Sequence, residues 1–160
     1  LVIHPGDLKK GELTQVIELV RACQMTPVII TSKELSYLDD SVEQLVDPCA
    51  GKLSPLYSES LGLVEGSQCS IPLFSLQAMA SGRPIIALDS DFNSQVLGEF
   101  SSFLHFSMKE LLDQVKNVRQ ISYDPKKLRV HASRYSQIRF KAGLIRKLKE
   151  IGHPVTFSKN

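Results

Sequence analysis

The segment LFSLQAMASGRPIIALD, residues 73–89, decides the fold. Its first half carries apolar residues at helical spacing, Gly82 follows as a helix stop, and Pro84 opens an apolar run. The pattern predicts a helix over 72–81 and a buried strand over 84–88. A helix that leads directly into a buried strand is typical of α/β domains.

The same alternation extends in both directions from this segment. On the N-terminal side we expect strands over 1–4, 27–31 and 61–64, helices over 11–23 and 33–46, and a short helical region over 53–58. On the C-terminal side we expect a short helix over 93–100, an edge strand over 102–106 and a helix over 107–118 that begins with a capping box. A last helical stretch over 125–152, opened by Asp124 and Pro125, should break near residues 135–136.

Strands that are apolar on both faces and separated by helices imply a parallel sheet covered on both sides. The sequence therefore predicts an α/β fold, a Rossmann-like parallel sheet with helices on both faces. Ligands of such sheets lie beyond the carboxyl ends of the strands. We expect a site among the loops 5–11, 31–33, 65–71 and 89–93.

Composition limits the class of protein. An apolar share of 42% and a charged share of 22% suit one globular domain, which we assign to residues 1–152 with a tail over 153–160. No apolar run approaches the roughly 20 residues that span a bilayer. Since the chain begins at Leu1 without an initiator Met or a leader, we expect a piece of a longer protein.

The cysteines and histidines favour a reducing cytosol and no metal cofactor. Three cysteines form no CxxC pair, which argues against a disulfide framework and a structural zinc site. The four histidines are scattered without helical pairing, so we interpret them, His4 included, as core or surface imidazoles.

Charge is divided unevenly along the chain. Residues 1–124 hold 9 Lys and Arg against 16 Asp and Glu, whereas residues 125–160 hold 10 against 1. The basic stretch lacks the interleaved aromatic residues and motifs of nucleic-acid binding. A contact with a membrane surface or a partner protein is the interpretation we keep, with Ile138, Ala142 and Ile145 as an apolar stripe that should pack on the body.

Residues 77–89, QAMASGRPIIALD, resemble a signature of GT-B glycosyltransferases of the retaining "glycosyl transferases group 1" type, whose helix and strand follow the pattern EAMA-x-G-x-PV(I)A-x-D. Residues 123–136 and 103–112 look like the family's later helices and edge strand, and residues 4–11 look like a shortened version of its GRL…KG loop. The resemblance covers roughly residues 61–151.

This resemblance implies the donor-nucleotide-binding half of such an enzyme, with an N-terminal GT-B domain missing. Lys10 and Gly11 match the family's phosphate-binding Lys-Gly, and the helix start at Ser70, Ile71, Pro72 and Leu73 is implied to face the donor. The motif of two glutamates is degenerate, because Cys69 and Gln77 stand in their places.

Other positions also depart from the family. Asp7 stands about where the diphosphate-binding Arg is expected, and its negative charge would repel a diphosphate. The resemblance places Gln77 where the family's ribose-binding Glu stands. A glutamine there can still form one hydrogen bond to a ribose hydroxyl but loses the charge-assisted strength of a carboxylate.

Two functions follow from the resemblance and its departures. The first is a hexosyltransferase-type enzyme that moves a sugar from a nucleotide-sugar to an acceptor once joined to its N-terminal domain. The second is a non-catalytic GT-B-like subunit or module that binds a partner or acceptor protein. For either we expect a cytoplasmic protein, with a peripheral position at the inner face of a membrane left open.

Overall fold

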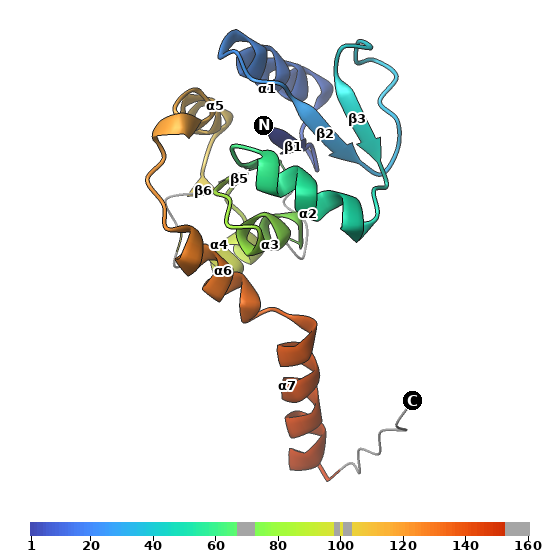
Figure 1. The fold of residues 1–160 in the computed structure, drawn as a ribbon, viewed down its shortest axis with the longest axis vertical. Helices are drawn as coiled ribbons and strands as arrows, with labels where there is room; N and C mark the ends of the chain where they lie inside the picture. The colour runs from blue at the N-terminus through green and yellow to red at the C-terminus, as the bar shows by residue number, and fades with distance from the viewer. Residues whose placement is uncertain (67–72, 98–99, 101–103, 153–160) are drawn as a thin grey trace.

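The chain folds into a six-stranded parallel sheet with helices on both faces (Figure 1). The computed structural model describes residues 1–66, 73–97, 100 and 104–152. The strands are β1 (Val2–His4), β2 (Val28–Thr31), β3 (Glu43–Val46), β4 (Leu63–Glu65), β5 (Ile85–Leu88) and β6 (Leu104–His105), in the order β3-β2-β1-β4-β5-β6. The helices are α1 (Lys10–Ala22), α2 (Ala50–Glu59), α3 (Leu73–Ala80), α4 (Asp91–Leu97), α5 (Met108–Lys116), the 3₁₀ turn η2 (Val118–Gln120), α6 (Pro125–Ser133) and α7 (Gln137–Glu150). The predicted Rossmann-like α/β class is confirmed.

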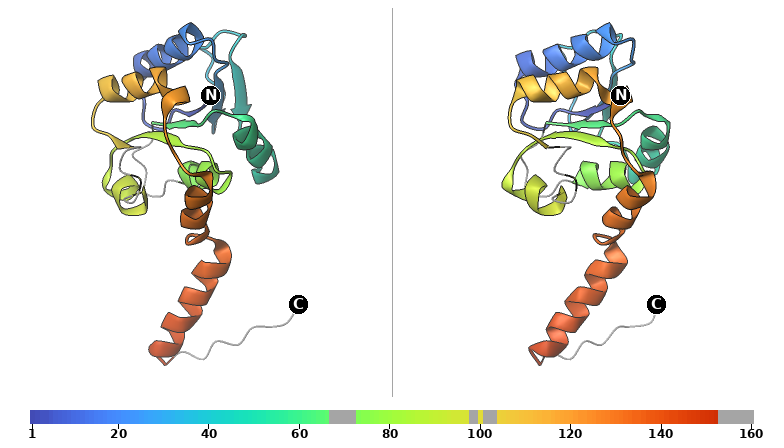
Figure 2. Two further views of the ribbon diagram at one scale, coloured as in Figure 1. Left: turned by 60° about the vertical axis from the view of Figure 1, so that its left-hand side comes forward. Right: turned by 90° about the vertical axis from the view of Figure 1, so that its left-hand side faces the viewer.

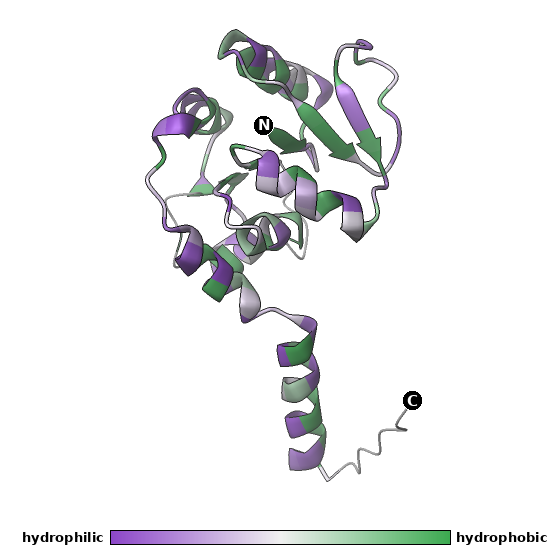
Figure 3. Ribbon diagram, in the orientation of Figure 1, coloured by the Kyte–Doolittle hydropathy of each residue, from purple (hydrophilic) through white to green (hydrophobic). Residues whose placement is uncertain are grey.

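Two apolar layers enclose the sheet, one on each face (Figure 2). Successive residues of a strand point to opposite faces, so Ile3 packs with α1 and α5 while Val2 packs with α2, α3 and α6. β4 and β5 show the same division. This arrangement explains why both the inward and the outward positions of the central strands are apolar before the polar residues His4, Thr31 and Glu65 that end β1, β2 and β4 (Figure 3).

Local signals fixed most of the remaining elements. Gly82 ends α3 with a φ of +74°, as a helix stop requires. The Ser107 side chain accepts a hydrogen bond from the Glu110 N–H at the start of α5, and the Asp124 carboxylate accepts one from the Lys126 N–H at the start of α6. The predicted break in the last helical stretch lies between α6 and α7.

The helix predicted over 33–46 is wrong: a turn-rich loop crosses most of this segment and ends in the edge strand β3. Side chains take over the hydrogen bonds that a helix would make. The Asp39 carboxylate accepts a bond from the Ser41 N–H, and the Gln44 side chain accepts one from the Leu35 N–H. The apolar residues of this segment, although spaced as on a helix, therefore pack against the core from a loop.

The C-terminal helix α7 projects away from the body (Figures 1 and 2). None of its residues is buried, and Ile138 and Phe140 are 82% and 68% exposed. The expectation that its stripe packs on the body is therefore wrong. Among the described residues, no helix combines the length and the apolar character needed to cross a membrane.

Candidate functional site

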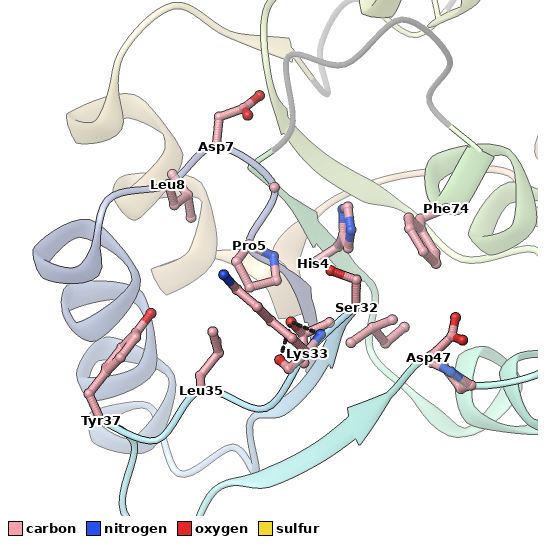
Figure 4. A pocket seen from close by; sticks show the side chains of 14 residues that line it. His4, Pro5, Asp7, Leu8, Ser32, Lys33, Leu35, Tyr37, Asp47 and Phe74 are labelled. Carbon is pink, nitrogen blue, oxygen red and sulfur yellow. Dashed lines mark hydrogen bonds between the residues drawn. The ribbon is translucent and has the colours of Figure 1, made fainter.

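The site lies beyond the carboxyl ends of the central strands. There, a cavity of about 380 Å³ opens between the segments that follow β1, β2 and β3 and the first turn of α3 (Figure 4). Its lining residues are His4, Pro5, Gly6, Asp7, Leu8, Ile30, Thr31, Ser32, Lys33, Leu35, Tyr37, Asp47, Pro48 and Phe74. The strand order changes direction between β1 and β4, which is where Rossmann-like sheets hold their ligands.

The loop after β1 is fixed against the end of β4. The Gly66 N–H donates to the His4 carbonyl at 2.9 Å, and the Asp7 N–H donates to the Gly66 carbonyl at 3.3 Å. The approach is so close that a Cβ atom on Gly66 would lie 2.3 Å from the Pro5 carbonyl oxygen. One wall of the cavity therefore has a defined backbone.

His4 and Glu65 form a pair at the change of strand order. They occupy facing register positions on β1 and β4, and His4 Nδ1 lies 2.5 Å from Glu65 Oε1. The Glu65 side chain is only 2% exposed, while the His4 side chain is 19% exposed. The Phe74 ring lies against the imidazole, with 4.0 Å between ring centroids (Figure 4).

Neither residue was singled out from the sequence. His4 was interpreted as a core or surface imidazole, and Glu65 only as the beginning of a loop. A usable signal was present, because each is the polar residue that ends an apolar strand, and the two strands are neighbours. Tertiary packing determines which strands are neighbours, so the signal could be recognised only once the order of strands in the sheet was known.

Lys10 and Gly11 lie at the start of α1, beside the cavity. Lys10 is exposed, and its Nζ atom lies 4.8 Å from the centre of the Tyr37 ring, which itself lines the cavity. A Cβ atom on Gly11 would meet nothing within 4 Å, so no close packing requires a glycine there. Lys33, not singled out from the sequence, extends over the cavity instead (Figure 4).

The predicted residues around α3 are only partly described. Cys69, Ser70, Ile71 and Pro72 lie outside the described residues. Leu73, the first residue of α3, is 53% exposed, and it is the next residue, Phe74, that lines the cavity. The Gln77 Oε1 atom is buried and has no hydrogen-bond partner among the described residues.

Charges of both signs surround the cavity. Lys33 faces it, Asp7 and Asp47 line it, and Figure 4 shows the Asp7 carboxylate turned away from His4.

Burial, assisted by the charge of Glu65, raises the pKa of Tyr57, which therefore keeps its proton under all ordinary conditions. Within the described residues, no three His, Cys, Asp or Glu side chains are grouped as metal ligands.

Comparison with known proteins supports the fold. No family model and no curated protein matches the sequence. Among solved structures, the chain is similar to AviGT4, a glycosyltransferase involved in avilamycin A biosynthesis, with a TM-score of 0.64 and 12% sequence identity. The match covers 95% of this chain and 52% of AviGT4, so the chain spans about half the length of that enzyme. The chain therefore has a glycosyltransferase-like α/β fold.

Proposed function

We propose that the chain is the donor-nucleotide-binding half of a GT-B glycosyltransferase of the retaining group 1 type. Joined to an N-terminal domain, it would transfer a hexose from a nucleotide-sugar to an acceptor. The observation that carries the proposal is the cavity at the change of strand order, in a sheet whose fold is similar to half of a glycosyltransferase. The signature resemblance of residues 77–89, which form part of α3, the turn after it and β5, supports the same assignment.

The charged residues suit a diphosphate leaving group. In this proposal Lys10, whose Nζ atom lies over Tyr37, and the cavity residue Lys33 supply positive charge to the diphosphate. Backbone N–H groups donate further hydrogen bonds to it, and no metal ion takes part. Gln77 lies one turn along α3 from the cavity residue Phe74, and in this proposal its side chain binds the ribose. The acceptor is presented by the N-terminal domain, so the chain alone binds nucleotide without turnover.

Calorimetric titration of the chain with UDP, GDP, ADP and their sugar conjugates tests the proposal. We expect one base to bind at least about tenfold more tightly than the others, since a specific pocket discriminates by 1–3 kcal/mol. The substitutions Lys10→Ala and Lys33→Ala should each weaken binding of the nucleoside diphosphate more than binding of the free nucleoside, because the lysine charge acts on phosphate. Binding of none of these ligands would refute the donor-binding role.

A second function, a non-catalytic module that binds a partner, has one observation in its favour. Helix α7 exposes Ile138, Phe140 and Leu144 along its length, and none of its residues is buried. A helix whose apolar residues are packed against nothing is only marginally stable in water without a partner. If the titrations detect no nucleotide, this surface becomes the main candidate for function.

A further inference from the structure

The pairing of His4 with Glu65 is a built arrangement. A buried carboxylate is costly unless a partner compensates its charge, and Glu65 has His4 Nδ1 at 2.5 Å. An ionised carboxylate can only accept hydrogen bonds, so the hydrogen on Nδ1 is donated to Glu65. The ring is thereby held with its other nitrogen, Nε2, as the atom left for a ligand.

The surroundings leave Nε2 available. No hydrogen bond of Nε2 is formed with any residue in the part of the chain that the structure describes, and the imidazole belongs to the cavity lining. Phe74 covers one face of the ring and limits its rotation. With Nδ1 already donating, protonation places a second N–H donor and a positive charge at Nε2.

We propose that protonated His4, oriented by Glu65, binds the diphosphate of the donor nucleotide. This inference rests on the function proposed above and names the group that supplies the charge expected from the loop after β1. Asp7 occupies that loop, and Lys10 is placed over Tyr37 beside the cavity. A charge-assisted bond from an imidazolium to phosphate compensates for the missing arginine.

The charged groups around His4 make the predicted pH dependence specific. Glu65 faces it from β4, Asp7 follows on the loop after β1, Lys10 begins α1, and Lys33 and Asp47 follow β2 and β3. The α3 residues described around Phe74 carry no ionisable group. Among these residue types, histidine is the one that exchanges a proton near neutral pH.

Titration with UDP, GDP and ADP between about pH 8 and about pH 5.5 tests the inference, with His4→Gln as the variant. Because the terminal phosphate itself titrates in this range, the readout is the ratio of wild-type to variant affinity at each pH. We expect the ratio to rise about tenfold toward low pH for the diphosphate and to stay constant for the nucleoside. Thermal melting and nucleoside binding check that the variant folds.

A measurement on the unmodified chain covers the case in which the variant does not fold. At neutral pH, saturating diphosphate should move the His4 Nε2 ¹⁵N resonance toward the protonated form, and the nucleoside should not. Nucleotide binding with a constant affinity ratio, or with an unchanged Nε2 resonance, would overturn the role of His4 and leave the donor site standing. Absence of nucleotide binding at every pH would overturn both.

Discussion

Two glycines beside the cavity differ in what a side chain would meet. A Cβ atom on Gly66 would lie 2.3 Å from the Pro5 carbonyl oxygen and 2.4 Å from Leu8 Cγ, whereas one on Gly11 would meet nothing within 4 Å. We expect Gly66→Ala to lower the free energy of unfolding by about 1–3 kcal/mol, because backbone atoms must shift. Gly11→Ala, in the first turn of α1, should raise it by up to about 1 kcal/mol. Urea denaturation of both variants measures these changes in the free energy of unfolding, and equal changes would contradict the packing argument.

Gln77 offers a second test at the level of one side chain. Its Oε1 atom is buried and has no partner among the described residues, so an ionised carboxylate there pays a desolvation cost unless a ligand bonds it. We expect Gln77→Glu to destabilise the unliganded chain by at least about 1 kcal/mol and to tighten nucleotide binding. Melting curves with and without UDP, GDP and ADP measure both effects. Gln77→Ala is the control, and a weaker affinity in Gln77→Glu would place the ribose elsewhere.

The sequence identified few of the residues that the cavity brings together. Lys10 was named by resemblance and lies beside Tyr37, which lines the cavity, but His4, Glu65 and Lys33 were not singled out. Each of the three ends or follows an apolar strand, a position that acquires meaning only when the strand order is known. Chemistry that depends on which strands are neighbours cannot be deduced from spacing along one segment.

At the level of elements, strands and helices with strong local signals were predictable, and β3 was not. β5 is a continuous apolar run and β1, β2 and β4 are apolar up to their last residue, whereas β3 is a partly exposed edge strand with the pattern Glu43-Gln44-Leu45-Val46. Edge strands need not be apolar on both faces, so β3 lacks the continuous apolar run that marks a buried strand. The preceding loop depends on tertiary hydrogen bonds, including two from the Arg21 guanidinium on α1 to Asp39.

The same contact between α1 and the loop before β3 predicts a pH effect. Hydrogen bonds from Arg21, followed by those from Ser41, hold the pKa of Asp39 well below its usual range. A carboxylate with a lowered folded-state pKa stabilises the fold above its unfolded pKa, and this contribution is lost as the pH falls through the folded value. We therefore expect Asp39→Asn to melt below the wild type at neutral pH and the two melting temperatures to converge below about pH 4.

Melting temperatures at low salt between neutral and strongly acidic pH measure this convergence, since salt screens exposed pairs. The matched control is Asp40→Asn. This substitution removes the same charge, and Asp40 forms no ion pair with a described residue. A difference between wild type and Asp39→Asn that persists unchanged into acid, or equal behaviour of both variants, would contradict the assignment.

At the level of the whole molecule, the body and α7 have different physical roles. The body buries two apolar layers on the sheet, whereas α7 buries nothing and carries apolar residues beside Arg139, Arg146 and Lys147. Substitutions on α7 should therefore leave the thermal stability of the body nearly unchanged. A helix with an apolar face and a cationic face is also the type that lies in the interface of an anionic membrane.

We accordingly expect the protein to sediment with anionic vesicles but not with neutral ones, and the association to fall as salt screens it. Each Lys or Arg near an anionic leaflet contributes about 1 kcal/mol to the free energy of membrane binding. Replacing Arg139, Arg146 and Lys147 with Gln should therefore weaken binding by about 3 kcal/mol and abolish sedimentation. Replacing Lys52, Lys109 and Lys127, which are exposed on the body, removes the same charge and should leave sedimentation largely intact. Equal losses in both triple variants would show attraction by net charge alone, and no sedimentation of the wild type at low salt would leave the apolar face of α7 to a protein partner.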